Sequence, residues 1–339
     1  MPNAVIILGA GSSADFGVPI LSRIFSDAQA RQYVISNPGF YEMLRETIWE
    51  PRGLTLDTAY LGPTIEDILT MLRDWESANE RDSQNIDPPP DLENFRRHIY
   101  VSIQRAVFQN KSTSPGYLNT LINRCRKDFE NVTWATFNWD CIFESSFYYS
   151  SAPPMGIRQN PTVAVKLDNW WQGDAKHLFL KLHGGINWWL VDGKLKYFSW
   201  GGHEIQEMWD QYSEHPLPNA EPVILEPSFY KYLHSPAFEA LRGQWNVFFH
   251  RLIDADYVIV IGYSLPDLDT YARENVLVAF QLNAKCRWLI VDPNRQTLDK
   301  YTRLLGSTRI TTREETLTSF SNDLCTNLEM AFPGFKCSS

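Results

Sequence analysis

Continuous apolar runs recur along the chain, with longer amphipathic stretches between them. The runs occupy residues 4–8, 132–137, 178–182, 257–261 and 288–291. An apolar run of this length without alternation is typical of a strand that is buried on both faces of a parallel sheet. The stretches 92–108 and 236–253 have the length and pattern of helices. Strands that alternate with helices predict an α/β fold with a Rossmann-like, doubly wound parallel sheet.

Two segments interrupt this alternation, and we expect residues 1–339 to form a single catalytic domain that contains both. Residues from about 20 to 125 are mostly helical in pattern, with Thr64 and Asp67 placed to cap one helix. We interpret this region as a mostly α-helical inserted subdomain that covers one edge of the sheet. A second insertion spans about 185–235, where Asp192 and Gly193 separate two apolar runs and predict a β-hairpin.

Composition narrows the classes of function that fit the chain. The formal net charge is −9 and no Lys/Arg-rich tract occurs, so direct nucleic-acid binding is not expected. The five cysteines form no C-x-x-C pair, which argues against a zinc site and against a secreted disulfide framework. No signal peptide and no membrane-spanning run occurs. We therefore expect a cytoplasmic protein without a metal, and a catalytic fold that starts with the first strand.

A glycine-rich segment follows the first predicted strand. Gly9, Ala10, Gly11, Ser12 and Ser13 begin a G-x-G-x-x-[GA] pattern, in which small residues let the backbone approach a pyrophosphate. A dehydrogenase would continue into a second strand that ends in an acidic residue. The sequence GVP follows at residues 17–19 instead. Dinucleotide binding therefore remains the prediction, and hydride transfer becomes less favoured.

Four short motifs follow predicted strands in a fixed order. They are G-A-G-x-S-x-x-x-G-V-P at residues 9–19, N-W-D at 138–140, H-G at 183–184 and G-Y-S-L at 262–265. In this order the set resembles the motifs of the sirtuins, and it covers most of the chain. Because parallel sheets bind ligands beyond the carboxyl ends of their strands, we expect the four segments to meet at one crevice.

The sirtuin resemblance implies a role for each of these residues. His183 would be the general base and Asn138 would orient a ribose hydroxyl or the attacking water, so these two residues are the predicted catalytic pair. Asp140 would hold the nicotinamide carboxamide of NAD. Asp15 stays open between a site role and a capping role. The residues expected to contact the rest of NAD are Gly9, Ala10, Gly11, Ser12 and Ser13 at the phosphates, Gly262 and Ser264 near the phosphates and ribose, and Asp292 and Asn294 near the adenosine.

The chain departs from the protein-deacylating sirtuins on the acyl-peptide side. It lacks their paired C-x-x-C zinc module, and Phe137 replaces the glutamine before their N-x-D motif. The remaining pattern resembles the sirtuin-like NAD hydrolases of bacterial anti-phage defence. That likeness implies cleavage of NAD to nicotinamide and ADP-ribose. It also implies control by homo-oligomerisation or by a partner such as a HerA-type ATPase or a short Argonaute-like protein.

Other interpretations of the same residues stay open at this stage. An NAD-dependent deacylase or ADP-ribosyltransferase would need an acceptor for the ribosyl group, and the missing zinc ligands speak against deacylation. A non-catalytic NAD or ADP-ribose sensor would not need both Asn138 and His183. A plain interaction module with a degenerate nucleotide pocket would bind neither nucleotide.

Overall fold

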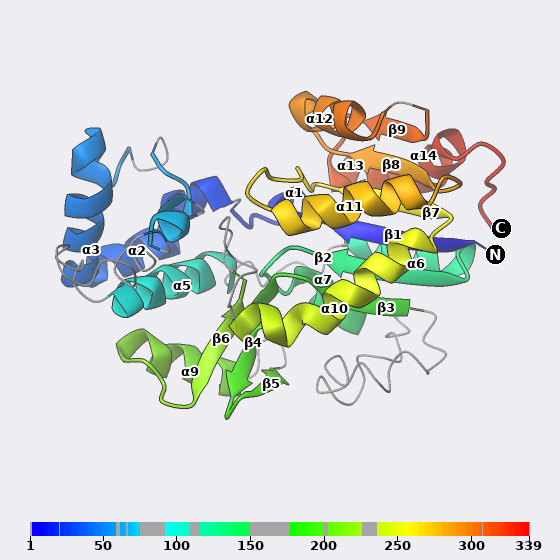
Figure 1. Cartoon of the computed structure of the whole chain (residues 1–339). Helices are drawn as coiled ribbons and strands as arrows, with labels where there is room; N and C mark the ends of the chain where they lie inside the picture. The colour runs from blue at the N-terminus through cyan, green and yellow to red at the C-terminus, as the bar shows by residue number, and fades with distance from the viewer. Residues whose placement is uncertain are drawn as a thin grey trace.

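The core of the protein is a six-stranded parallel sheet with the strand order β3-β2-β1-β7-β8-β9 (Figure 1). Its strands are β1 (Asn3–Leu8), β2 (Asn131–Thr136), β3 (His177–Lys181), β7 (Tyr257–Ile261), β8 (Arg287–Val291) and β9 (Ile310–Arg313). The computed structural model describes residues 2–19, 21–58, 62–65, 67–72, 74, 92–108, 116–149, 177–198, 203–225, 236–306 and 308–338. The prediction of a Rossmann-like, doubly wound sheet is confirmed.

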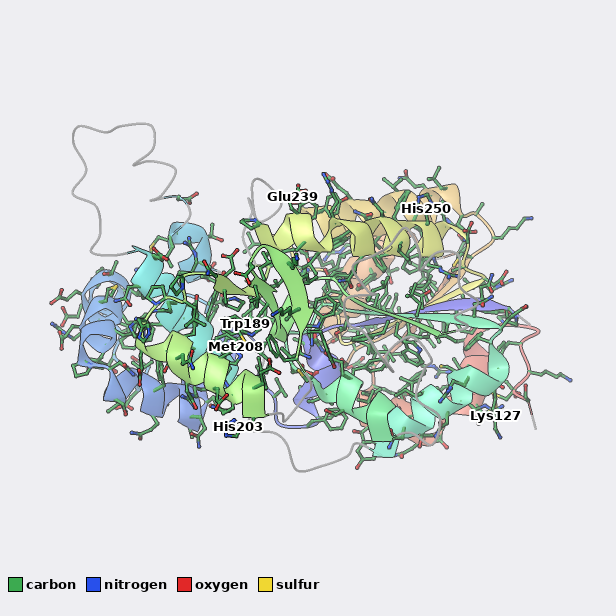
Figure 2. The ribbon with its side chains drawn as sticks, turned by 90° about the horizontal axis from the view of Figure 1, so that it is seen from below. Lys127, Trp189, His203, Met208, Glu239 and His250 are labelled. Atoms are coloured by element: carbon green, nitrogen blue, oxygen red, sulfur yellow. A yellow bond between two sulfur atoms is a disulfide. The ribbon has the colours of Figure 1, made fainter. Side chains whose placement is uncertain are left out.

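Helices cover both faces of this sheet, as the unbroken apolar strands require. Ile6 of β1 belongs to a core that includes α6 (Gly116–Asp128), α13 (Leu317–Asn322) and α14 (Leu324–Ala331). The next residue, Ile7, belongs to a second core with α10 (Pro236–Ile253), α11 (Thr270–Leu282) and α12 (Arg295–Leu305). Figure 2 shows the two layers, with α10 on one side of the sheet and α6 on the other. The period-two alternation of side chains on a strand thus separates two hydrophobic cores.

A small antiparallel sheet follows β3 directly. It has the order β5-β4-β6, from β4 (Gly184–Val191), β5 (Lys194–Tyr197) and β6 (Ala220–Ile224). The predicted hairpin between β4 and β5 is confirmed, with positive φ angles at Asp192 (51°) and Gly193 (67°) as a tight hairpin turn requires. Helix α9 (His203–Glu214) packs on this sheet, where Trp209 donates its indole N–H to the carbonyl of Ile186.

The two segments predicted as separate insertions pack on each other. The first contains η1 (Leu21–Ser26), α2 (Ala28–Ser36), α3 (Pro38–Leu44), the turns η2 (Arg45–Trp49) and η3 (Glu50–Arg52), and α5 (Leu92–Phe108). Arg97 of α5 donates to the carbonyl of Tyr212 in α9 over 2.9 Å. The predicted helix cap is confirmed: Thr64 and Asp67 exchange side-chain to backbone hydrogen bonds.

The position expected for the helical insertion is wrong. Helices α2, α3 and α5 do not cover an edge of the sheet but lie beyond the carboxyl ends of its strands, next to the small sheet (Figure 1). The physical reason is the apolar face of α5, which packs with α2 and α9. Helix α6, at the end of the insertion, packs on a face of the main sheet. The insertion therefore lies at the end of the sheet where the parallel strands terminate (Figure 1).

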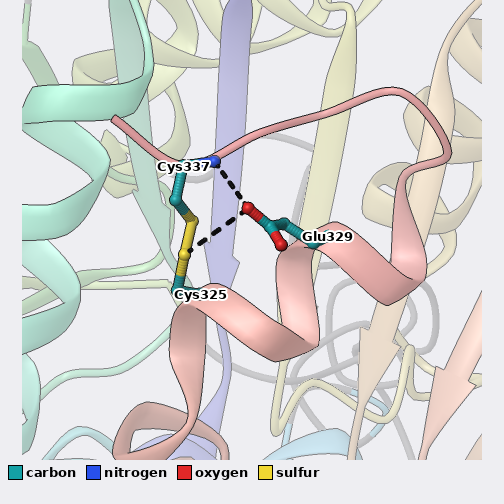
Figure 3. A group of neighbouring side chains, drawn as sticks. All are labelled: Cys325, Glu329 and Cys337. Carbon is teal, nitrogen blue, oxygen red and sulfur yellow. Dashed lines mark hydrogen bonds between the residues drawn. A yellow bond between two sulfur atoms is a disulfide. The ribbon is translucent and has the colours of Figure 1, made fainter. Parts of the chain in front are cut away.

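The C-terminal segment carries one disulfide, between Cys325 of α14 and Cys337 (Figure 3). Glu329 accepts a hydrogen bond from the backbone N–H of Cys337 over 3.0 Å. These three residues are also the one group of potential metal-binding side chains found among the described residues, and as a disulfide the two sulfurs offer no thiolate. The cysteine spacing did not predict this pairing. Among the described helices, none is long and apolar enough to cross a membrane.

Candidate active site

The candidate site is a cavity of about 550 Å³ at the carboxyl ends of the parallel strands. It lies at the topological switch point between β1 and β7, from which the following strands are added in opposite directions across the sheet. This is the usual ligand position in doubly wound folds. Segments that follow β1, β2, β3, β7 and β8 all contribute to it. The predicted site residues that line the cavity are Ala10, Gly11, Ser13, Asp15, Asn138, Asp140, His183, Gly262, Ser264, Asp292 and Asn294.

The remaining two predicted residues, Gly9 and Ser12, lie beside the cavity in the β1–α1 turn, where α1 spans Ala10–Ala14. Gly9 donates its N–H to the carbonyl of Ile261 over 3.0 Å. A Cβ atom at Gly9 would stand 2.4 Å from the Cα of Tyr263, and one at Gly262, where φ is +62°, would stand 2.3 Å from the nitrogen of Ser12. The structure thus shows that these glycines allow two loops to pack backbone against backbone.

Asn138 is fixed at the centre of the site by its side-chain amide. Its Nδ2 donates to the carbonyl of Gly9 over 2.9 Å and to the hydroxyl of Ser13 over 2.8 Å. A carbonyl can only accept, so the contact with Gly9 sets which way the amide faces. The other amide atom, Oδ1, is buried and has no hydrogen-bond partner among the described residues. A buried acceptor without a donor is costly, and this one belongs to a residue that lines the cavity, where a ligand could supply the donor.

His183 meets a carboxylate that the sequence did not single out. Its Nε2 lies 3.1 Å from Oδ2 of Asp269, and both side chains are almost fully buried. The imidazole also packs edge-on against Phe137, which stacks on Tyr263 with ring centroids 4.0 Å apart. Phe137, the residue that departs from the sirtuin pattern, therefore forms part of the cavity wall and the packing around His183.

Asp140 lines the cavity and also caps a helix. Its Oδ1 accepts the backbone N–H of Ile142 over 3.0 Å, at the start of α7 (Ile142–Tyr149). Its carbonyl accepts a hydrogen bond from the ammonium of Lys181, which is fully buried. Asp140 therefore caps the helix and also lines the cavity. The two roles are compatible, because the cap uses one carboxylate oxygen.

A buried ion pair supports the turn that carries Asn138 and Asp140. Lys181 contacts the carboxylate of Glu144 in α7, and both side chains are almost completely inaccessible. Burial lowers the pKa of Lys181, but the charges of Glu144 and Asp140 and the hydrogen bond to Glu144 are among the effects that together outweigh it, so its pKa lies above the ordinary value and the ammonium stays charged. The cation lies behind the cavity wall and does not line the cavity.

Asp15, which the sequence left between a site role and a capping role, caps a helix. Its Oδ2 accepts the backbone N–H of Thr318 over 3.0 Å, in the first turn of α13. The capping role is thus present, although the capped helix lies 303 residues away in sequence. Asp15 also lines the cavity, so the cap does not remove it from the site.

The far end of the cavity is built from a short local motif after β8. Asp292 accepts the N–H of Asn294 over 2.8 Å, and Asn294 accepts the N–H of Gln296 at the start of α12. Burial raises the pKa of Asp292 above its ordinary value, although the hydrogen bonds from Asn294 and Thr297 oppose the shift.

The described lining residues that carry a charge at neutral pH are carboxylates, and none of the described lining residues is Lys or Arg. The acidic residues are Asp15, Asp140, Asp269 and Asp292. Asp269 is the functional candidate that sequence reasoning missed. Its signal was weak, because Asp267 and Asp269 both follow the G-Y-S-L motif and nothing in the sequence separates them. In the structure the side chain of Asp267 is exposed, whereas that of Asp269 is buried against His183.

Comparison with known proteins returned matches among solved structures alone. The chain matches no protein-family model and no curated protein. It is similar to the structure of Sir2Tm bound to a propionylated peptide, with a TM-score of 0.49 and 12% identity, over 95% of this chain and 92% of that chain. A Sir2–p53 peptide–NAD⁺ complex gives a TM-score of 0.49 and 12% identity, over 96% and 93% of the two chains. Similarity at this level says nothing about the reaction.

Proposed function

We propose that this protein hydrolyses NAD⁺ at the bond between nicotinamide and ribose, giving nicotinamide and ADP-ribose. The observation that carries the proposal is the meeting of Asn138, Asp140 and His183 with the β1–α1 and β7–α11 segments around one cavity. These residues come from strands that are far apart in sequence. Their convergence at the topological switch point is what the sirtuin-like motif set requires.

The cavity fits a dinucleotide in size and polarity. Its volume of about 550 Å³ lies within the usual range of ligand pockets. Polar side chains line it on both sides of the switch point, with Asn138 and His183 after β2 and β3 at one end and Asp292 and Asn294 after β8 at the other. In the absence of lining Lys or Arg side chains among the described residues, backbone N–H groups would have to carry the phosphate contacts.

The charge of the cavity suits a substrate that carries a positive ring. Nicotinamide in NAD⁺ is cationic and leaves as a neutral molecule, so positive character develops on the anomeric carbon of the ribose. The carboxylate of Asp140, which is almost fully buried in the cavity wall, would stabilise such a charge. The leaving group needs no acid, and the work left to the protein is to orient the ribose and to deliver water.

Two residues would perform that work. The Oδ1 of Asn138, a buried acceptor without a partner among the described residues, would accept a hydrogen bond from a ribose hydroxyl or from the attacking water. His183 would take the proton that water loses as its oxygen bonds to the anomeric carbon. The bonding electrons of the broken bond leave with nicotinamide, so the balance is one NAD⁺ and one water to nicotinamide, ADP-ribose and a proton.

Nicotinamide release from NAD⁺ tests this proposal. The wild-type chain should release nicotinamide and ADP-ribose in equal amounts without any acceptor. His183→Ala and Asn138→Ala should each lower the rate by about 10²–10⁴. His203→Ala is a matched control, because His203 lies on α9 with an exposed side chain, and it should keep the wild-type rate.

The same assay separates the competing functions. Release that depends on an added acylated peptide or another acceptor would favour a deacylase or an ADP-ribosyltransferase. Tight NAD⁺ binding without turnover would favour a sensor. Full activity in folded His183→Ala and Asn138→Ala variants, with unchanged melting temperatures, would overturn the assignment of the site.

We extend the proposal to a gated, NAD-depleting effector of bacterial anti-phage defence, on the strength of the motif pattern. Unrestrained NAD⁺ hydrolysis would harm the cell that makes the enzyme, so its activity must be controlled. Control by a homo-oligomer or by a HerA-type ATPase or short Argonaute-like partner predicts that NAD⁺ turnover changes with assembly. Light scattering together with turnover, measured with and without the product of a neighbouring gene, tests this extension.

A further inference from the structure

The proposed site leaves one close contact without a role. Asp269 stands at the N-cap position of α11, where an aspartate normally accepts a backbone N–H of the first turn. Here its side chain makes no such capping bond. The carboxylate turns instead to His183, with 3.1 Å between Oδ2 and Nε2. Giving up a cap costs about 1 kcal/mol, so the contact with His183 is made at the expense of the helix.

The carboxylate is held from its other side by a tyrosine. The hydroxyl of Tyr263 donates to the same Oδ2 of Asp269 over 2.6 Å. Tyr263 is itself fixed, because its ring stacks on Phe137 and its carbonyl accepts the hydroxyl of Tyr301 over 2.9 Å. The geometry is thus a chain from Tyr301 through Tyr263 and Asp269 to His183.

The backbone between Tyr263 and Asp269 is held under strain. Leu265 is fully buried and has a φ of +50°, a region that leucine rarely adopts. The ammonium of Lys300 donates to its carbonyl over 2.6 Å and helps to fix this conformation. Strain of this kind persists where the surrounding structure determines a functional geometry.

We propose that Asp269 is the positioning residue for His183, fixed in turn by Tyr263. This inference rests on the proposed function and deepens it. Asp269 accepts the Nε2–H of His183 and so sets both the tautomer and the plane of the ring. The lone pair then lies on Nδ1, which takes the proton from water while Asp269 stays ionised and balances the imidazolium. A neutral side chain at this position would carry no charge to balance the imidazolium.

Two aromatic rings also pack on the imidazole. Among the described residues, Phe137 packs on it from the β2 side and Trp245 from α10, and neither ring titrates in the working range. Tyr263 faces it from the same segment as Asp269. Asp15, Asp140 and Asp292 are further titratable groups that line the same cavity.

Asp269→Asn tests the inference, because it keeps the size of the side chain and removes its charge. We expect kcat for nicotinamide release to fall by about 10²–10⁴, while KM changes little. The acidic limb of the pH–rate profile should move to lower pH by about 1–3 units, since an anionic neighbour raises the pKa of an imidazole. Asp269→Glu, which keeps the charge, should restore part of kcat.

Asp267→Asn is the matched control in the same segment. The Asp267 side chain is exposed and pairs with Lys300 and Arg273, so its loss should leave kcat within about twofold. Tyr263→Phe removes one hydrogen bond to Asp269 and should lower kcat about fivefold. This second variant keeps the inference testable if Asp269→Asn folds poorly.

The outcomes separate this inference from the proposed function. Wild-type kcat and an unmoved pH profile in a folded Asp269→Asn variant would overturn the positioning role and leave the hydrolase intact. If the wild type releases no nicotinamide, the hydrolase fails, and nitrogen NMR of His183 decides the contact independently. The inference then requires an Nε2–H tautomer and a higher histidine pKa in the wild type than in Asp269→Asn, and it is wrong if the two proteins titrate alike.

Discussion

The two ends of the cavity are built in different ways. We call them the Asn138 end (Asn138, Asp140 and His183) and the Asp292 end (Asp292, Asn294 and Thr297). At the Asn138 end, Asn138 and His183 are held from distant parts of the chain, by the bond from Asn138 to Gly9 across 129 residues and by the contact of His183 with Asp269, and Asp140 alone is held by its own turn. At the Asp292 end the contacts join residues two positions apart, such as Asp292 and Asn294.

This difference indicates what each end can tolerate. A polar group that is held from several elements keeps its position only while the whole fold is intact, so a change there should affect both stability and rate. A group that is held by its own turn depends on that turn alone. We therefore expect substitutions at the Asp292 end to affect nucleotide selection and local stability, and to leave the rate of bond cleavage nearly unchanged.

The largest effect should come from the ion pair behind the Asn138 end. Lys181→Met leaves the carboxylate of Glu144 buried without its partner, and we expect the free energy of unfolding to fall by about 3–5 kcal/mol. Denaturant unfolding measures this change. The double variant Lys181→Met/Glu144→Leu should recover much of it, because no uncompensated charge remains. A single variant as stable as the wild type would show that the pair does not support the turn.

Selection against NADP⁺ should be the next effect in size. Its additional phosphate would approach the carboxylate of Asp292 in a cavity whose described lining has no Lys or Arg. Placing like charges together costs several kcal/mol, so kcat/KM for NADP⁺ should be about 100-fold lower than for NAD⁺. Asp292→Asn should narrow this ratio. Equal kcat/KM values of the wild type for NAD⁺ and NADP⁺ would mean that the adenosine does not bind beside Asp292.

A smaller effect is expected from the cap of α12. Asn294→Ala removes the side-chain oxygen that accepts the N–H of Gln296, which should cost about 1 kcal/mol of stability. Thermal unfolding and steady-state kinetics on the same sample check both parts of the prediction. A fall in kcat as large as that of His183→Ala would contradict the distinction between the two ends.

The smallest effect concerns the pH dependence of stability. Burial raises the pKa of Asp292, so its ionised form costs stability above that pKa, and the cost disappears as the pH falls below the value in the unfolded chain. Asp292→Asn removes the cost and keeps an acceptor for Asn294. Its melting temperature should exceed that of the wild type by about 1–3 °C at neutral pH. The difference should vanish near pH 3, and a constant difference would point to another cause.

Much of the fold could be predicted, because its strands are apolar and buried on both faces. The predicted strand at residues 257–261 and the predicted helix at 236–253 coincide with β7 and α10. Two strands gave no such signal. β9 reads ITTR and lies at the edge of the main sheet, and β6 contains Pro222, which an edge strand tolerates.

The sequence predicted which strand ends carry the site residues, but it did not predict the contacts between their side chains. The motif order placed Asn138 and His183 at one crevice, and the structure brings them to one cavity. The sequence could not separate capping from ligand binding at Asp15, because the helix that it caps lies at the other end of the chain. It also could not choose between Asp267 and Asp269, since only tertiary packing buries one of them.

A crystal structure of the His183→Ala variant soaked with NAD⁺ tests the central claim most directly, because the variant should bind the nucleotide and cleave it slowly. The account predicts the nicotinamide ribose beside Asn138 and Asp140, the phosphates against the β1–α1 turn, and the adenosine beside Asp292 and Asn294. A nucleotide bound outside this cavity, or a cavity that stays empty at saturating NAD⁺, would contradict it.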